Sequence, residues 1–356
     1  MNTRLFVLLS FLLSLSGAYA QKYSNEFLSI GIGGAANGNG HAVVASINDA
    51  TAAYWNPAGL SRIHPDIRLQ LSAMHTDWFA GVGKFDYLGA LIPLNVSGRV
   101  IAVSLLRFGV DNIPNTLTLY EQDGTVNYDN LSSFSAADYA FLFSYSQALT
   151  PSIPGLYVGG NLKIIHRLIG PFARSWGFGL DAGLQYQRNR WQWGLVIRDL
   201  THTFNAWSFQ FTEAEKNILQ LTNNEVPINS LELTRPSLVL GVSRSFDLGK
   251  YGLRPELNWI IHTDGERNTL FNMDPLSFDP VLGLEGNYKE QIYLRFGFNQ
   301  LQQETLFGEA VWTIRPAVGI GIHPGAIGID YAFTDPGGGG ESTYSHIISL
   351  KVGLKQ

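Results

Sequence analysis

Apolar and polar residues alternate along most of this chain with a period of two. Between Trp176 and Tyr186, every even-numbered position is apolar or aromatic, and every odd-numbered position is Gly, Asp or Gln. A helix would spread these side chains around its axis, whereas a strand sorts them onto two faces. The same alternation recurs at 292–299, 327–334 and 348–354. The pattern therefore predicts a protein built from β-strands.

Fourteen strands are predicted, an even number that suits a single-chain bacterial barrel. They span residues 66–75, 82–94, 98–108, 134–148, 155–168, 174–188, 190–199, 236–247, 251–262, 278–288, 290–299, 313–323, 325–334 and 344–354. The connections after even-numbered strands are short, whereas most of those after odd-numbered strands are longer, with extremes at 109–133 and 200–235. Short turns at one end and long loops at the other are typical of an outer-membrane barrel, with the turns in the periplasm.

A secreted soluble β-protein is the alternative, because one face of its sheet would also be buried and would alternate similarly. The composition of the second face of the sheet distinguishes a soluble protein from a membrane barrel. In the segment 176–186 that face is rich in Gly and nearly uncharged, whereas soluble sheets place Lys, Glu and Thr in water. We therefore expect an antiparallel transmembrane β-barrel of about 14 strands.

Composition supports a barrel and excludes several other classes. Charged residues make up 15 % of the 356 residues, against about 25 % in an ordinary soluble chain. The absence of Cys excludes disulfide scaffolds and thiolate chemistry. A net charge of −5 argues against a nucleic-acid partner, which needs a basic face. No apolar run after residue 20 approaches the length of a membrane-spanning helix.

The N-terminal region has two predicted parts. Arg4, the apolar stretch 5–15 and Ala18-Tyr-Ala20 form a secretory signal peptide over residues 1–20, which predicts export to the outer membrane. Residues 21–65 show no sustained alternation. They include a helix-prone stretch that Asp49 would cap and that Pro57 would end. We expect this segment to form a hatch in the lumen of a barrel spanning 66–356, because about 14 strands enclose more space than wall side chains fill.

The string Asp49-Ala-Thr-Ala-Ala-Tyr-Trp-Asn-Pro-Ala-Gly-Leu60 resembles the N-terminal signature of the PorV/PorQ family, which are outer-membrane barrels of the type IX secretion system. More distantly it resembles the hatch of FadL-type fatty-acid transporters, which also carry an Asn-Pro-Ala turn. Later segments similar to the PorV/PorQ family follow in order, at 223–229, 236–241, 281–286, 294–297 and 328–333.

The resemblance implies a non-enzymatic barrel in contact with outer-membrane lipid. PorV-like members bind secreted proteins through their type IX sorting domains, and PorQ-like members anchor a subunit of the surface attachment complex. The FadL resemblance implies an alternative, a transporter of hydrophobic small molecules. A purely structural outer-membrane barrel is a third hypothesis.

Three groups of residues are candidates for function. A luminal charge network is predicted from inward positions at Asp181, Arg254, Glu256, Glu285, Arg295, Asp330 and Lys351. Such charges need partners; they either fix the hatch or line a polar passage. The second group, at the hatch turn, could shape a ligand pocket or simply end the hatch helix: Tyr54, Trp55, Asn56 and Pro57.

The third group lies in the two longest connections, which could be docking surfaces for a partner or lids on the barrel mouth. The connection 109–133 contains Asp111, Ile113 and Pro114. The connection 200–235 contains a capping box from Thr212 to Glu215, which predicts a short amphipathic helix carrying Ile218 and Leu219. The eight His residues match no catalytic motif. We expect no enzyme activity, metal site or cofactor.

Overall fold

The computed structural model describes residues 24–94, 98–119, 125–149, 152–265, 267–306, 309–335 and 344–355. The predicted signal peptide lies outside these ranges. Strand β1 (Ile67–Trp78) pairs on one side with β2 (Gly83–Pro93) and on the other with β18 (Ser345–Lys355). The sheet therefore closes on itself as a barrel, which removes the exposed edges of an open sheet.

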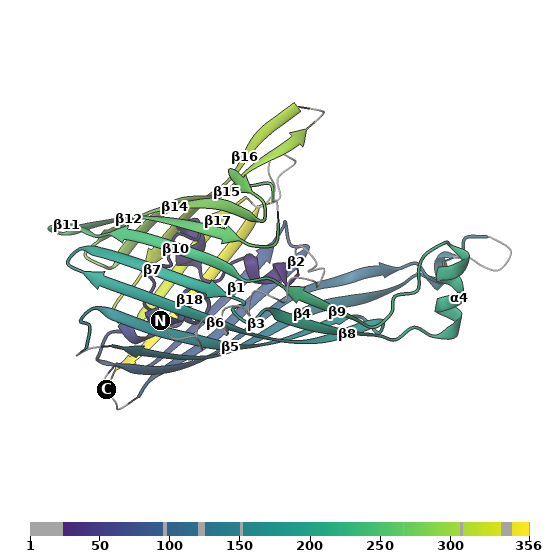
Figure 1. Ribbon diagram of the computed structural model, residues 1–356, viewed down its shortest axis with the longest axis horizontal. Helices are drawn as coiled ribbons and strands as arrows, with labels where there is room; N and C mark the ends of the chain where they lie inside the picture. The colour runs from purple at the N-terminus through teal and green to yellow at the C-terminus, as the bar shows by residue number, and fades with distance from the viewer. Residues whose placement is uncertain are drawn as a thin grey trace, which may run out of the picture.

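In the described part of the chain, fourteen antiparallel strands pair in a closed circuit and make up the wall, as the alternation predicted. Figure 1 shows this wall. Between β2 and β18 its strands are β3 (Arg99–Asn115), β4 (Ser132–Ala148), β5 (Leu156–Ile169), β6 (Ala173–Arg188), β7 (Trp191–Arg198), β10 (Ser237–Arg244), β12 (Tyr251–His262), β14 (Leu276–Tyr288), β15 (Ile292–Leu306), β16 (Glu309–Ile322) and β17 (Ile327–Thr334). Strands β3 and β15 run several residues past their predicted ends. In each, a bulge beside Asn112 or Gln300 shifts the phase of the alternation, so the pattern is lost where the strand continues.

Four short strands extend the wall: β8 (Thr203–Phe209), β9 (Ser230–Thr234), β11 (Phe246–Leu248) and β13 (Phe271–Met273). The prediction of one long loop over 200–235 was wrong, because β8 continues β7 along β6, and β9 pairs with β8 and leads into β10. Asp199 and His202, which have positive φ, separate β7 from β8. Pro236, which has no backbone N–H to pair, separates β9 from β10.

The outer face of the wall is apolar at the positions that the alternation assigned to it. Phe178, Leu180, Leu294 and Phe296 are 42, 39, 52 and 56 % exposed. An exposed apolar surface on this scale would drive association in water, whereas in a membrane it contacts lipid. The soluble alternative is therefore excluded. No helix in the described part of the chain is long and apolar enough to cross a membrane.

The two ends of the barrel differ as predicted. Most turns at one end, where the chain also finishes, are short, and at the other end hairpins β3–β4, β8–β9 and β15–β16 project beyond the rim (Figure 1). A correction applies to Asp111, Ile113 and Pro114. They lie on β3, paired with or beside β4, and not in a loop.

The described part of the predicted hatch begins at residue 24, and its segments from Gly38 to Pro57 pack against the inner face of the wall. The hatch contains η1 (Glu26–Ser29), α2 (Gly34–Gly38), α3 (Ala52–Trp55) and η2 (Pro57–Arg62). The predicted helix over 48–54 is shorter than expected, and Asp49 does not cap it. Its carboxylate instead accepts hydrogen bonds from the backbone N–H and hydroxyl of Thr51, at 2.9 and 2.5 Å, in an Asx turn.

Candidate functional site: the hatch and two luminal cavities

The hatch is seated on a belt of inward-facing wall glycines. At Gly283 and Gly297 the hatch backbone around Asn39 comes so close that a methyl group on either glycine would overlap it. The other members of this glycine belt, each with the hatch residue it faces, are Gly159 (Pro57), Gly183 (Asn56 and Pro57), Gly194 (Val44), Gly241 (Ala45) and Gly319 (Gly38). Wall side chains would hold the hatch away, so the glycines permit backbone-to-backbone packing.

Asn56 fixes the hatch turn to the wall. Its side-chain amide donates to the carbonyl oxygens of Val44, at 2.9 Å, and Leu184, at 3.1 Å. Its Oδ1 accepts from the N–H of Ala58 at 3.2 Å and so caps η2, with Pro57 in the first position, where a missing N–H costs nothing. Asn56 is fully buried. It therefore joins two parts of the hatch to β6.

Of the four candidates at this turn, Asn56 and Pro57 pack against the wall, whereas Tyr54 and Trp55 line a cavity. The Tyr54 hydroxyl donates to the carbonyl oxygen of Leu28, and Trp55 Nε1 donates to that of Ile32 at 2.9 Å. Burial raises the pKa of Tyr54, and the nearby charge of Arg198 only partly offsets it. These two hydrogen bonds from the aromatic side chains thus hold the first turns of the hatch in place.

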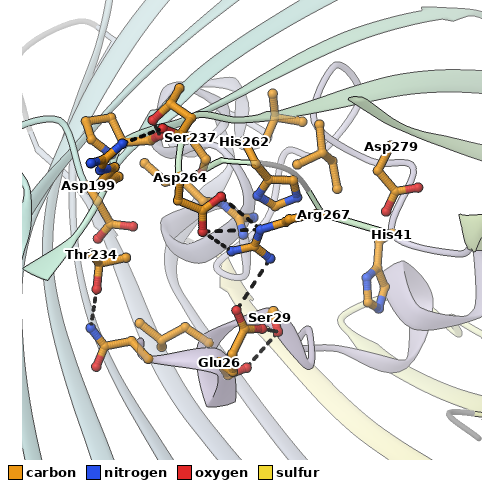
Figure 2. A pocket seen from close by; sticks show the side chains of 18 of the residues that line it. Glu26, Ser29, His41, Asp199, Thr234, Ser237, His262, Asp264, Arg267 and Asp279 are labelled. Carbon is orange, nitrogen blue, oxygen red and sulfur yellow. Dashed lines mark hydrogen bonds and ion pairs between the residues drawn. The ribbon is translucent and has the colours of Figure 1, made fainter. Parts of the chain in front are cut away.

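The outer cavity has a volume of about 400 Å³ and lies between the hatch and the loop ends of β7, β10, β12 and β14. Its lining includes Trp55 and Arg198, together with His262 and Asp279, which Figure 2 labels. Polar side chains point into it from several elements (Figure 2).

Two ion-paired groups border the outer cavity. Lys163 of β5 is nearly buried and contacts Asp181 at 3.0 Å and Asp199 at 2.5 Å. Arg267 contacts Asp264 at 2.5 Å and Glu26 of the hatch at 3.6 Å, which ties the β12–β13 connection to η1 (Figure 2). Burial by itself would raise the pKa of Asp264, but its hydrogen bonds to Arg267 outweigh burial and hold that pKa below its ordinary range.

Arg198 faces the hatch from the end of β7. Its guanidinium lies 5.2 Å from the ring of Tyr54 and 5.8 Å from that of Trp55. The ring of His41 packs on that of Trp55 and lies within the electrostatic influence of the Arg198 guanidinium. Burial, followed by the charges of Arg198 and Arg315, lowers the pKa of His41 to about 3. The imidazole is therefore neutral at physiological pH.

The inner cavity, of about 330 Å³, lies on the turn side of the hatch. Hatch residues between Ala35 and Asp49 line it, while His41 and Val44 of the same stretch line the outer cavity. One stretch of hatch thus separates the two cavities.

Five of the seven predicted luminal charges gather at the inner cavity: Arg254, Glu285, Arg295 and Lys351 line it, and Asp330 contacts Arg295. Arg295 contacts Glu285 at 2.6 Å and Asp330 at 2.7 Å, and Arg254 contacts Glu285 at 2.8 Å. His323, which the sequence analysis did not select, lies 3.0 Å from Asp330. Arg295 is only 3 % exposed, so these contacts replace its hydration.

The other two predicted charges lie apart from this cluster. Asp181 borders the outer cavity, as described above, and Glu256 accepts a hydrogen bond from the N–H of Ala45 at 2.8 Å. Lys351, within the cluster, lies 3.4 Å from Asp49. Glu256 and Lys351 therefore contact the hatch directly.

The predicted helix in the 200–235 connection is confirmed as α4 (Glu213–Leu221), at the tip of the β8–β9 hairpin. Thr212 Oγ1 accepts from the N–H of Glu215 at 3.3 Å, and the Glu215 carboxylate accepts from the Thr212 N–H at 2.7 Å, which completes the capping box. Ile218 and Leu219 are partly exposed on this helix. Nearby, Leu221, Ile228 and Leu231 are 83, 78 and 62 % exposed.

No protein-family model matches the sequence, and no curated protein matches it. Solved structures do. The chain is similar to the toluene transporter TodX of Pseudomonas putida, with a TM-score of 0.56 and 12 % identity over 91 % of this chain and 98 % of that one. The fold is that of the FadL-type barrels.

Two further solved structures agree. The toluene transporter TbuX of Ralstonia pickettii has a TM-score of 0.55 and 12 % identity, over 91 % of this chain and 98 % of that one. A FadL homologue of Pseudomonas aeruginosa has a TM-score of 0.52 and 12 % identity, over 90 and 97 %. These likenesses support the FadL-like part of the sequence resemblance and an outer-membrane location, whereas membership of the PorV/PorQ family stays a prediction.

Proposed function

We propose that this chain is a FadL-like outer-membrane transporter that passes small organic molecules across the barrel. The observation that carries the proposal is the pair of cavities on opposite sides of one hatch stretch, Ala35–Asp49. A displacement of that stretch would join them into a passage from the loop side to the turn side. The fold likeness to the toluene transporters supports hydrophobic compounds as the first class to test.

The test locks the hatch. The natural sequence has no Cys, so Asp49→Cys with Lys351→Cys gives one thiol on the hatch and one on the wall, where the native side chains lie 3.4 Å apart. A reversible bifunctional methanethiosulfonate reagent then joins them. The matched control is Tyr331→Cys with His346→Cys, a pair within the wall whose native side chains lie 2.8 Å apart.

Entry of labelled toluene and of labelled benzoate into intact cells is the measurement. Expression of the chain is expected to raise entry of at least one of them at least tenfold, the hatch–wall cross-link to remove that gain, and a reducing agent to restore it. The wall–wall pair is expected to have no effect. If expression changes entry of neither compound, the transport proposal is contradicted. Entry that is unaffected by the hatch–wall cross-link would contradict movement of the hatch.

A second candidate function is docking of an exported protein in type IX secretion, which the sequence resemblance implies. The observation that favours it is the projecting β8–β9 hairpin, where Leu221, Ile228 and Leu231 are largely exposed (Figure 1). Exposed apolar side chains of this kind mark protein contacts. Capture of the chain from its native membrane, followed by mass spectrometry, should return proteins with type IX sorting domains or attachment-complex subunits. Their absence would count against this candidate.

A further inference from the structure

The outer cavity carries chemistry that a bare hydrocarbon does not use. We propose that it binds a small organic carboxylate that also bears hydrogen-bond donors, such as a hydroxylated ring acid, with the carboxylate toward Arg198 and the donors toward Asp279. This inference rests on the proposed transport function and names the class of its substrate.

Unpartnered polar atoms gather in the lining of the outer cavity. Within the described part of the chain, Arg198 Nε, Asn258 Oδ1, Asp279 Oδ1 and Gln300 Oε1 are buried and have no hydrogen-bond partner. Asn258 and Asp279 are only 1 and 4 % exposed. Buried polar groups are normally paired. A donor group at one end and an acceptor group at the other are therefore complementary to this lining.

The register of the wall separates the two ends. Arg198 pairs with Ser237, Ser237 with His262, and His262 with Ser277, which is two residues from Asp279. Three steps between neighbouring strands correspond to about 14 Å along the wall. Arg198 and Asp279 thus face the cavity from different strands, with room for a small molecule between them.

The guanidinium of Arg198 is the group suited to a carboxylate. The lining as a whole is balanced, with five basic and five acidic side chains. Lys163 is already held by Asp181 and Asp199, and Arg267 by Asp264 and Glu26. Arg198 instead packs on the rings of Tyr54 and Trp55, and its Nε has no hydrogen-bond partner among the described residues. A guanidinium keeps its charge in proteins.

The position of His41 agrees with a positive charge at Arg198. Its ring lies on the hatch below Asp279 (Figure 2), and burial, followed by the charges of Arg198 and Arg315, lowers its pKa. The part of the cavity beside His41 therefore lies within the electrostatic influence of these arginines. A planar carboxylate matches the fork of an arginine, which can donate two parallel hydrogen bonds to it.

A hydrocarbon would fill the same volume without meeting these groups. It would displace water from the lining and leave Arg198 Nε, Asp279 Oδ1 and Asn258 Oδ1 without hydrogen-bond partners, which opposes binding. A molecule with the same ring, a carboxylate and two hydroxyl groups satisfies both ends. The comparison of three ring compounds of similar size therefore tests the inference directly.

The experiment measures binding to the full chain purified in detergent, with 3,4-dihydroxybenzoate, benzoate and toluene as probes. We expect 3,4-dihydroxybenzoate to bind at least tenfold more tightly than benzoate, and benzoate more tightly than toluene. Arg198→Gln is expected to weaken both carboxylates at least tenfold and to leave toluene unchanged. Asp279→Leu, which keeps the branched skeleton but replaces both acceptor oxygens with methyl groups, is expected to weaken only 3,4-dihydroxybenzoate.

Arg244→Gln is the matched control. It removes the same charge from the turn end of β10, where Arg244 is exposed and lies 5.0 Å from the ring of Trp191. The folded state of each variant is checked by its heat-modifiable migration in gels, and the order of the three probes on the unaltered chain needs no variant at all. Toluene binding as tightly as either acid, or an Arg198→Gln effect no larger than that of Arg244→Gln, would overturn the inference. Because binding in detergent is independent of entry into cells, that result leaves the transport proposal standing.

Discussion

Gly283 of β14 lies so close to Asn39 of the hatch that a single added methyl group would overlap the Asn39 side chain and carbonyl. Gly286, three residues further along the same strand, lies on the other strand face, where an added methyl group would meet only Leu253 and Leu294, at an ordinary contact distance of 4.0 Å. Gly286 therefore lacks the contact with the hatch that Gly283 has.

Gly283→Ala is expected to push the hatch away from the wall and to raise the ion conductance of single barrels in planar bilayers severalfold. Gly286→Ala, the matched control, is expected to leave conductance unchanged. Both variants should keep the heat-modifiable migration of a folded barrel, because the wall hydrogen bonds are unaffected. Equal conductance of the two variants would show that the glycine belt does not seat the hatch.

Arg295→Met is expected to destabilise the barrel by about 3–5 kcal/mol, because it leaves the buried carboxylates of Glu285 and Asp330 without their shared partner. Denaturant unfolding followed by tryptophan fluorescence measures the change. Arg190→Met removes an exposed ion pair with Asp247, whose atoms lie 3.6 Å apart, and should cost less than about 1 kcal/mol. A similar loss in both variants would contradict a structural role for the inner cluster.

Acidification is expected to loosen the hatch through His41. In the seated hatch its pKa is about 3, below the ordinary 6.5, so a displaced, solvated His41 takes up a proton more readily. The seated state is therefore fully favoured above pH 6.5 and loses stability as the pH falls toward 3. At pH 5 the loss is about 2 kcal/mol.

Single-barrel conductance at pH 7.5 and pH 5 measures this effect. His41→Asn is the suitable control, because His41 has a φ of 73° and Asn adopts that conformation more readily than most residues. This variant should flatten the response to pH between 7.5 and 5. An unchanged response would assign the pH dependence to another group.

Removal of residues 210–229, with Phe209 joined to Ser230 through a short glycine linker, is expected to leave the barrel folded, since α4 lies at the tip of a projecting hairpin (Figure 1). If the second candidate function holds, the deletion abolishes recovery of proteins with type IX sorting domains, while toluene entry stays unchanged. Unchanged recovery would contradict docking at α4.

The strand faces could be predicted from the sequence because each depends on nearest neighbours alone. Phe178 and Leu294 point to lipid because side chains alternate between the two faces of a strand, and these positions fall on the apolar face. The α4 capping box was predictable for the same reason, since Thr212 and Glu215 are one turn apart. The pattern failed at Asn112 and Gln300, where bulges change the phase.

The partners of the luminal groups could not be predicted. Lys163 and Arg198 have inward parity like many other residues, and nothing local indicates that Lys163 meets Asp199 or that Arg198 lies over Tyr54. The inward glycines were visible in the sequence, but their purpose depends on a hatch that is far away along the chain. Inward glycines at matching depth on several strands would have been the one available signal for a plug in contact with the wall.

The sequence by itself determined that this chain is a closed barrel with an apolar exterior, because period-two alternation is a local property of the extended backbone. Only the tertiary structure decided how the hatch sits on the glycine belt, which charges pair and where the two cavities lie. The seating of the hatch brings together residues more than a hundred positions apart, such as Asn56 and Leu184. Their proximity is set by the circumference of the barrel and not by any spacing along the chain.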